Sequence, residues 1–351
     1  TGANYHFNHG LTKGISPVGV SNPDLRWERS TQLDIGLDLS LLENRVNLTV
    51  DVYKKTTEDL LYDKALPFTS GYGLITSNLG GIENKGIEFS ANVRIADGDF
   101  KWTVNGNVSA NRNRVTDIDG GVTTERFLTT YTLLKVGEPL GTFKTYVFDG
   151  IYQSGETIIP GADGRIGGTK VRDVVADGVI NSSDQVITGD PNPDFIYGFS
   201  SNASYKNFDL ALFISGTQGN DIYNVARASF ENPLGQRNLF AGVVNRWTPD
   251  NANNEYAAPL QGGRLPITDR FLEDGSYLRL KNITLGFTLP RIKGISRARI
   301  YVSGNNLFTI TDYSGFDPEV NTFAGSNTSI GVDNLVYPSA KSFLGGIQVT
   351  F

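Results

Sequence analysis

Apolar and polar residues alternate with a period of two along many short stretches of this chain. In residues 341–351, Phe343, Ile347 and Val349 fall on one side of the alternation, and Gln348 and Thr350 fall on the other. Successive side chains of a β-strand point to opposite faces, so this pattern predicts a strand with one apolar and one polar face. A strand of about ten residues with an apolar outer face is typical of an outer-membrane β-barrel, and an edge strand of a soluble sheet is the alternative.

The same alternation recurs and predicts an all-β protein of eleven strands. The predicted strands span 32–39, 46–52, 87–95, 102–109, 128–137, 142–152, 195–205, 208–216, 276–289, 297–309 and 341–351. Residues 1–25 are expected to form a loop, and no stretch has the 3.6-residue period of an amphipathic helix. No apolar run approaches the roughly 18 residues of a membrane helix, so a membrane protein with this sequence would cross as strands.

The predicted connections alternate between short and long. Short turns are expected near 41–44, 96–99, 138–141, 206–207 and 290–296, and long loops near 63–73, 115–127, 153–193, 217–272 and 310–340. Outer-membrane barrels have short periplasmic turns and long extracellular loops. The asymmetry therefore predicts a transmembrane antiparallel β-barrel with a periplasmic C-terminus and polar strand faces, including Asp34, Asp38, Asp51 and Glu88, that line its lumen. Bacterial single-chain barrels usually have an even number of strands, so eleven strands are not expected to close alone, and an upstream part of the same barrel is expected.

Composition removes several classes of function. The 351 residues include no Cys, which excludes disulfides and Cys-based zinc or redox sites, and the only two histidines, His6 and His9, lie in the expected opening loop. The net charge is -6 without a basic block, which argues against binding to nucleic acid. The chain has no Met and no signal peptide, and we interpret it as a piece of a longer protein.

Seven motifs, in order along the chain, resemble those of SusC-like TonB-dependent outer-membrane transporters of Bacteroidetes. They are NPDLRWE at 22–28, the stretch 72–88 with NKGIE at 84–88, VGEPLG at 136–141, DGIYQ at 149–153, GSYLRLKNIT at 275–284, SGNNLFTI at 303–310 and GFDPE at 315–319. The resemblance implies a barrel of 22 strands with an N-terminal plug. Residues 1–351 would be its C-terminal part, about eleven strands, without the plug.

The resemblance also implies the function. Family members import oligosaccharides or peptides through the outer membrane, are embedded in its lipids and are not enzymes. They work with a SusD-like surface lipoprotein that acts as a lid, and with the TonB-ExbB-ExbD complex, which they would reach through the missing N-terminal region. A soluble all-β carbohydrate-binding or structural protein is the alternative. The sequence leaves the substrate and its binding residues unknown.

One loop carries a candidate metal site. The stretch DVVADGVINSSD at 173–184 matches a calcium-binding loop at its first, fifth, sixth, eighth and twelfth positions. Asp173, Asp177 and Asp184 would supply carboxylate oxygens to calcium in an extracellular loop, while Val175 stands where a third Asp or Asn ligand is typical. The alternative is an acidic turn without a metal.

Aromatic residues gather in the long loops 217–272 and 310–340. Stacking on a sugar ligand is one interpretation, and membrane-interface contact, loop packing or contact with a lid protein are the others. The residues are Tyr223, Phe230, Phe240, Trp247, Tyr256, Tyr313 and Phe316.

Overall fold

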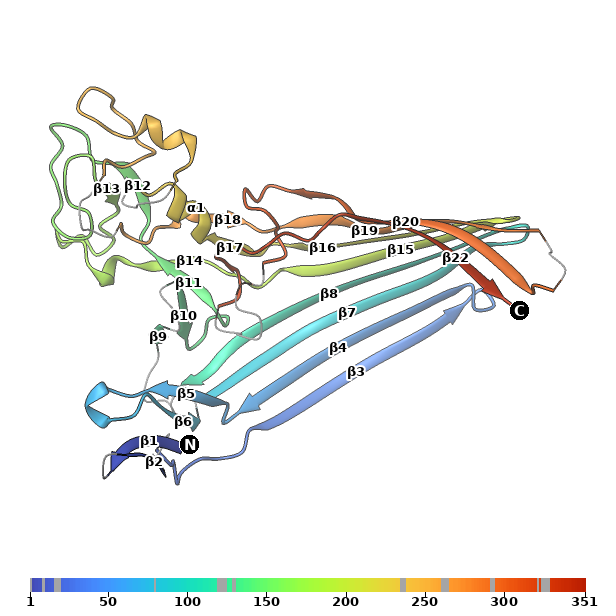
Figure 1. The fold of residues 1–351 in the computed structure, drawn as a ribbon, viewed down its shortest axis with the longest axis horizontal. Helices are drawn as coiled ribbons and strands as arrows, with labels where there is room; N and C mark the ends of the chain where they lie inside the picture. Colours follow the sequence, from blue (N-terminus) through green and yellow to red (C-terminus); the bar gives the residue numbers. More distant parts are fainter. Residues whose placement is uncertain are drawn as a thin grey trace.

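One long antiparallel sheet forms the larger part of the molecule, and the loop segments extend beyond one end of it (Figure 1). The computed structural model describes residues 2–7, 10–15, 20–78, 80–118, 125–127, 131–233, 238–259, 265–290, 294–320, 322 and 329–351. The sheet has nine strands in the order β22-β20-β19-β16-β15-β8-β7-β4-β3, so strands that follow each other along the chain are neighbours, as in an up-and-down barrel. Within the described residues β3 and β22 are its two edges, and it does not close.

The sheet strands are β3 (Arg29–Leu41), β4 (Val46–Glu58), β7 (Gly80–Asp97), β8 (Phe100–Ile118), β15 (Phe195–Tyr205), β16 (Phe208–Gln218), β19 (Tyr277–Thr288), β20 (Arg297–Thr311) and β22 (Ser342–Thr350). The smaller strands are β1 (Gly2–Phe7), β2 (Gly10–Ile15), β5 (Leu61–Ala65), β6 (Leu74–Asn78), β9 (Glu125–Phe127), β10 (Thr132–Lys135), β11 (Thr142–Thr145), β12 (Phe148–Ile151), β13 (Thr169–Val171), β14 (Val186–Gly189), β17 (Asp221–Asn224), β18 (Leu272–Asp274) and β21 (Val332–Asp333). The helical pieces are α1 (Val225–Phe230) and the 3₁₀ turns η1 (Phe68–Ser70), η3 (Ser182–Asp184), η4 (Ala241–Asn245) and η5 (Asp269–Phe271).

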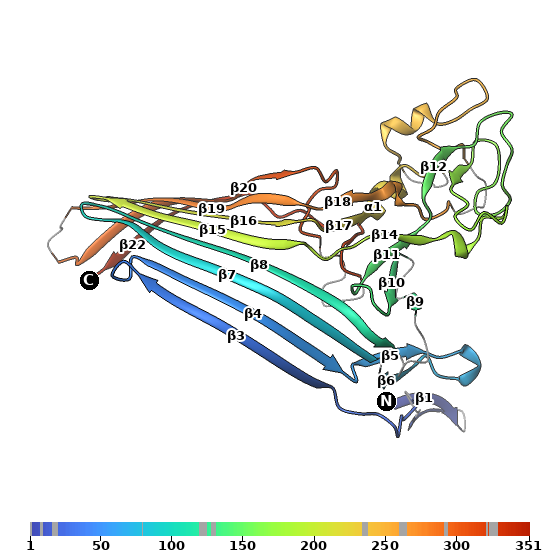
Figure 2. The same ribbon diagram turned by 180° about the vertical axis from the view of Figure 1, so that it is seen from behind.

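Short and long connections lie at opposite ends of the nine-stranded sheet. The short ones, at 42–45, 98–99, 206–207 and 289–296, meet at the end where the C-terminus lies (Figure 1). The long ones, which follow β4, β8, β16 and β20, gather at the other end, as the reverse view also shows (Figure 2). The predicted asymmetry is confirmed, and the two ends are named the turn end and the loop end below.

Each sheet strand has one apolar face, as its alternation predicts. The register places Leu37, Val50, Phe89 and Val108 side by side in one row across four strands. Leu37 is 55% exposed and Phe89 is 39% exposed. A soluble sandwich would bury such a row under a second sheet. An apolar face left open across whole rows instead suits contact with lipid.

The opposite face is polar. Asp38, Thr49, Ser90 and Asn107 form the neighbouring row, and the Thr49 hydroxyl donates a hydrogen bond to Asp38 Oδ1 at 2.7 Å. The other acidic residues predicted to line the lumen share this face by the same register. In the complete barrel this face would border the lumen.

An aromatic row marks the turn end of the apolar face. Phe100, Tyr205, Phe208 and Phe287 follow one another across β8, β15, β16 and β19. The rings of Phe208 and Phe287 lie 4.8 Å apart. Aromatic side chains favour the boundary between hydrocarbon and water, so this row suits one of the two girdles of a membrane barrel.

The prediction that residues 128–137 and 142–152 are barrel strands is wrong. β10 and β11 do pair as a hairpin, but they belong to a separate sheet of order β14-β11-β10-β9 at the loop end, and β12 pairs with β13. Thr132, Leu133 and Leu134 are all buried, so β10 has no face for lipid. The sheet therefore has nine strands instead of eleven, and the expected short turn at 138–141 lies among the loops.

Two expectations for the remaining segments are revised. The opening segment contains a hairpin of β1 and β2 in place of the expected loop; His6 lies in β1, whereas His9 lies outside the described residues. Helix is scarce, as predicted, although α1 forms one short turn of helix in the loops. No helix among the described residues is long and apolar enough to cross a membrane.

Candidate functional site

Three long loops pack into one assembly at the loop end of the sheet. Phe143 comes from the β8–β15 connection, Tyr223 and Phe271 come from the β16–β19 connection, and Val332 comes from the β20–β22 connection. All four are buried, and the Tyr131 ring lies 4.7 Å from the Tyr223 ring. Burial of several large apolar side chains in one cluster stabilises the contact among the three loops. The loop end of the sheet therefore carries an assembly of loops with its own core.

A second apolar cluster extends this assembly away from the sheet. Ile151 packs with Trp247 and Ala257, and the Trp247 indole N–H donates a hydrogen bond to Gln153 Oε1 at 3.0 Å. The contact joins β12 to the segment that follows η4. The indole ring packs in the apolar cluster and its N–H has a hydrogen-bond acceptor. Together these contacts fix the orientation of the Trp247 side chain.

A buried ion cluster anchors the β20–β22 connection to the sheet. Arg279 on β19 is 3% exposed; its guanidinium lies 2.5 Å from Asp317 Oδ1 and 2.5 Å from Glu319 Oε2. Lys281 and the Tyr277 hydroxyl also donate hydrogen bonds to Glu319. We name these five residues the Arg279 cluster. Buried charges are tolerated only when they are paired and hydrogen-bonded, so the cluster holds the GFDPE segment against β19.

The pKa of Asp317 reflects the contacts that this carboxylate makes within the cluster. Burial disfavours the carboxylate, but hydrogen bonds from Arg279 and from the backbone amides of Ser339 and Glu319 outweigh it and lower the pKa of Asp317 to about 2. Asp317 therefore stays ionised throughout the physiological pH range.

A second ion network connects α1 with the elements beside it. Arg227 on α1 lies 2.7 Å from Glu231 and 3.1 Å from Glu273 of β18, and Arg270 of η5 lies 2.7 Å from Glu231. Nearby, the Tyr313 hydroxyl donates a hydrogen bond to Asp333 at 2.5 Å. These contacts join the same loops that share the apolar core around Tyr223. The assembly is thus held by complementary charges as well as by apolar packing.

Amide and hydroxyl side chains form a hydrogen-bonded row across the polar face of the sheet. The register aligns Asn47, Asn92, Asn105 and Ser200, and Asn105 donates a hydrogen bond to Ser200 at 3.2 Å. Toward the β22 edge of the sheet, Asn282 donates a hydrogen bond to Asn305 at 2.7 Å, and Asn305 donates one to Ser342 at 3.1 Å. Such a face offers neutral donors and acceptors to a polar solute and has no fixed charge in this row.

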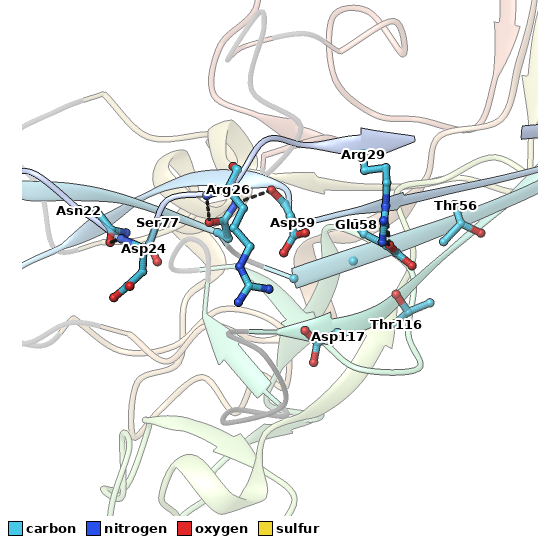
Figure 3. A pocket seen from close by; sticks show the side chains of 13 residues that line it. Asn22, Asp24, Arg26, Arg29, Thr56, Glu58, Asp59, Ser77, Thr116 and Asp117 are labelled. Atoms are coloured by element: carbon cyan, nitrogen blue, oxygen red, sulfur yellow. Dashed lines mark hydrogen bonds and ion pairs between the residues drawn. The ribbon is translucent and has the colours of Figure 1, made fainter. Parts of the chain in front are cut away.

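A polar hollow of about 840 Å³ lies where the segment before β3 meets the β4–β7 connection (Figure 3). Asn78 donates hydrogen bonds to the carbonyls of Arg26 and Asp59 at 2.9 and 2.7 Å and accepts one from the Arg26 amide. These hydrogen bonds fix the position of the NPDLRWE segment beside the β4–β7 connection. Charges of both signs line the hollow, from Asp24, Arg26, Arg29, Glu58, Asp59 and Asp117.

The acidic loop at 173–184 is held by its own backbone amides. Asp184 is fully buried and accepts hydrogen bonds from the amides of Val174 and Val175 at Oδ1, and from the amide of Asn181 at Oδ2. These bonds, with the one from Asn181 first, outweigh burial and hold the pKa of Asp184 below its ordinary value. Asp173 likewise accepts from Ala176 and Gly178, and Asp177 accepts from Val179.

The three predicted ligands share one loop, and the side chain of Asp173 interacts with that of Asp184. No group of three or more His, Cys, Asp or Glu side chains among the described residues is placed to hold a metal ion. Val175 supplies no carboxylate or amide oxygen to the loop. Calcium binding stays a prediction, which saturable terbium luminescence on the full-length protein, lost in Asp177→Asn, would test.

The loop aromatics divide into packed and exposed residues. Tyr223, Trp247 and Tyr313 are buried, which supports the loop-packing interpretation for them. Phe240 is 49% exposed and Phe316 is 71% exposed. The Phe240 ring lies 5.4 Å from the Phe230 ring, and the exposed parts of Phe240 and Phe316 can contact a solute or a partner protein at the loop end.

A wide antiparallel sheet with apolar rows on one face, polar rows on the other face and all long loops at one end defines a membrane β-barrel. A family model described as "TonB dependent receptor-like, beta-barrel" matches residues 3–307. The chain is 39% identical over 358 residues to TonB-dependent receptor P3 of Formosa agariphila, covering 96% of this chain and 36% of that protein. The chain belongs to the TonB-dependent receptor β-barrel family.

Two further relatives place it beside the SusC-type members. TonB-dependent receptor SusC of Bacteroides thetaiotaomicron is 29% identical over 94% of this chain and 32% of its own length. The structure of the RagAB peptide transporter superposes with a TM-score of 0.82 at 28% identity, over 100% of this chain and 38% of that chain. The chain thus spans about a third of the length of the curated relatives it matches, and the resemblance to SusC-like transporters is confirmed.

Proposed function

We propose that residues 1–351 are the C-terminal part of the barrel of an outer-membrane importer. The observation that carries the proposal is the two-faced antiparallel sheet with all long loops at one end. Family membership supports it, as does the similarity to a structure titled as a peptide transporter. The remaining strands of a barrel of about 22 strands, and a plug, would come from the upstream part of the same protein.

In this proposal the chain acts by passage and has no catalytic step. The loops face the cell exterior, the turn end and the C-terminus face the periplasm, and a solute passes along the polar face. The hydrogen-bonded row of Asn and Ser residues suits oligosaccharides and peptides alike, because both present neutral donors and acceptors. No residue is assigned a catalytic role, and the protein is proposed not to be an enzyme.

The proposed partners follow from the family. A SusD-like lipoprotein would sit over the loop assembly, where Phe240 and Phe316 are exposed, and the TonB-ExbB-ExbD complex would supply energy through the upstream region. Exposed aromatic side chains are typical of protein contact surfaces as well as of sugar sites. Support for the lid is therefore the exposed loop surface together with the relatives named above.

Deletion of the full-length gene and complementation test this function. Uptake of labelled oligosaccharide and peptide pools is expected to fall for one pool in the deletion strain, and to require the proton-motive force. Wild-type protein and the Lys206→Gln variant, which changes an exposed residue of the β15–β16 turn, should restore uptake, whereas Arg279→Gln should restore it only in part. Unchanged uptake of both pools after deletion would contradict the proposal.

A further inference from the structure

The apolar face of the sheet has a groove near its loop end. The groove has a volume of about 560 Å³ and runs across β3, β4, β7 and β8, which lie side by side in Figure 1. Leu33, Ile35, Val52 and Ile87 supply its apolar wall, while Lys54, Lys85 and Arg112 lie along its loop side. We name this feature the outer groove. It lies where the apolar rows give way to charged side chains.

Its three cations occupy directly opposite positions on neighbouring strands. The register pairs Lys54 with Lys85 and Lys85 with Arg112. Neighbouring strands are about 4.8 Å apart, and like charges directly opposite each other destabilise a sheet. A row of three cations in adjacent positions therefore gains stability from an anion at its surface.

The carboxylates of the protein neutralise this row incompletely. Glu83 lies 2.8 Å from Lys54 and 2.6 Å from Lys85, and Asp194 lies 2.5 Å from Arg112. Arg114, directly opposite Glu83 in the register, adds a fourth exposed cation. The Lys54 and Lys85 side chains remain 50% and 57% exposed, so both ammonium groups keep hydrogen-bond donors free for a further partner.

On the turn side the same groove is purely apolar. The next row is Ile35, Val52, Ile87 and Ala110, and the row of Leu37 and Phe89 follows it. An occupant that satisfies both halves must carry an anionic group at one end and hydrocarbon at the other. An acidic protein segment would satisfy the cations and leave the apolar rows to lipid tails, whereas a single phosphorylated lipid satisfies both.

We propose that the outer groove binds a phosphorylated lipid of the outer leaflet, with its phosphate on Lys54, Lys85 and Arg112 and its acyl chains along the apolar rows. The inference rests on the proposed function for its orientation, since the cations lie at the extracellular border only if the loops face outward. Basic side chains at a membrane border attract anionic headgroups, and phosphate oxygens accept hydrogen bonds from several Lys and Arg donors at once.

Native mass spectrometry of the full-length receptor, released from detergent micelles, tests the proposal. The probes are phosphatidate, diacylglycerol with the same acyl chains, and inorganic phosphate. Wild-type protein is expected to retain phosphatidate, and the variant Lys54→Gln/Lys85→Gln/Arg112→Gln should bind it at least about tenfold more weakly. The matched control Lys101→Gln/Lys206→Gln/Arg297→Gln removes three exposed cations at the turn end and should bind as wild type does. Retention of folded-barrel electrophoretic mobility shows that each variant has folded.

Three outcomes would overturn the lipid site. They are equal phosphatidate binding by wild type and the groove variant, equal retention of diacylglycerol, and displacement of the lipid by inorganic phosphate. The uptake assay and the topology of the loops report the proposed function separately. Phosphatidate retained by a protein whose deletion leaves uptake unchanged would reject the importer and keep the lipid site.

Discussion

At the residue scale, buried charge decides how the loops are attached. Arg279 reaches two carboxylates in the GFDPE segment, which lies 38 to 40 residues further along the chain. Neither partner is isolated: Asp317 also accepts from Ser339, and Glu319 also pairs with Lys281. The cluster is therefore the point at which a single substitution should free one loop without disturbing the sheet.

Arg279→Gln is expected to release the β20–β22 connection. Removing one partner of a buried ion pair leaves an unpaired carboxylate and costs roughly 3–5 kcal/mol. Hydrogen exchange should increase in residues 312–320 and 329–341 and stay slow in β19 and β20. Arg29→Gln serves as the control, because its pair with Glu58 is exposed to water and contributes little. Equal exchange in both variants would show that the cluster does not anchor the loop.

Asp184 should make the acidic loop sensitive to low pH. Its folded pKa lies below the ordinary value of 3.8, so its carboxylate contributes stability that is complete above about pH 4 and is lost as pH falls through the lowered pKa. Protection of the Val174, Val175 and Asn181 amides against exchange should follow that loss. Asp184→Asn should weaken protection by roughly 1–3 kcal/mol at pH 7 and abolish the pH dependence. The exposed Asp177→Asn is the matched control.

At the element scale, alternation predicted the strands that touch two different media. The sequence predicts the nine sheet strands because each has an apolar face toward lipid and a polar face on the other side. Apolar and polar residues therefore alternate with a period of two along each strand. The same alternation also predicts barrel strands at 128–137 and 142–152, but β10 is buried on both sides and belongs to a separate sheet. Turn positions near 42–44 and 206–207 were also predictable, where Leu42, Glu43, Asn44 and Lys206 have positive φ.

The site was less predictable than the strands. Asp173, Asp177 and Asp184 are close in sequence, and a motif could find them. The Arg279 cluster and the outer groove join residues far apart in the chain, and the row of Lys54, Lys85 and Arg112 exists only once the register is known. Two cues were present: charged residues within the GFDPE segment, and cations at the loop ends of successive strands.

Adjacent residues on β7 test the assignment of the two faces. Phe89 lies in an apolar row near the middle of its strand, and Ser90 lies in the neighbouring polar row. Phe89→Arg is expected to destabilise the barrel by about 2–4 kcal/mol, because it puts a charge into hydrocarbon, whereas Ser90→Arg should cost far less. Urea unfolding of the full-length protein in phospholipid vesicles measures both. Equal costs, or a larger cost at Ser90, would reverse the assignment.

At the scale of the whole molecule, the account places one end of the sheet outside the cell and the other in the periplasm. The segregation of loops and turns supports this orientation, because outer-membrane barrels have short periplasmic turns and long extracellular loops. Capture by the loops, passage along the polar face and contact with a surface lipoprotein all require it. The orientation is therefore the central claim.

Labelling of single cysteines in intact cells tests it most directly. This chain has no cysteine, so Val175→Cys in the acidic loop and Lys206→Cys in the β15–β16 turn introduce single reporters within it. A membrane-impermeant maleimide is expected to label Val175→Cys in intact cells, and Lys206→Cys only after the outer membrane is permeabilised. Labelling of Lys206→Cys in intact cells, with Val175→Cys protected, would contradict the account.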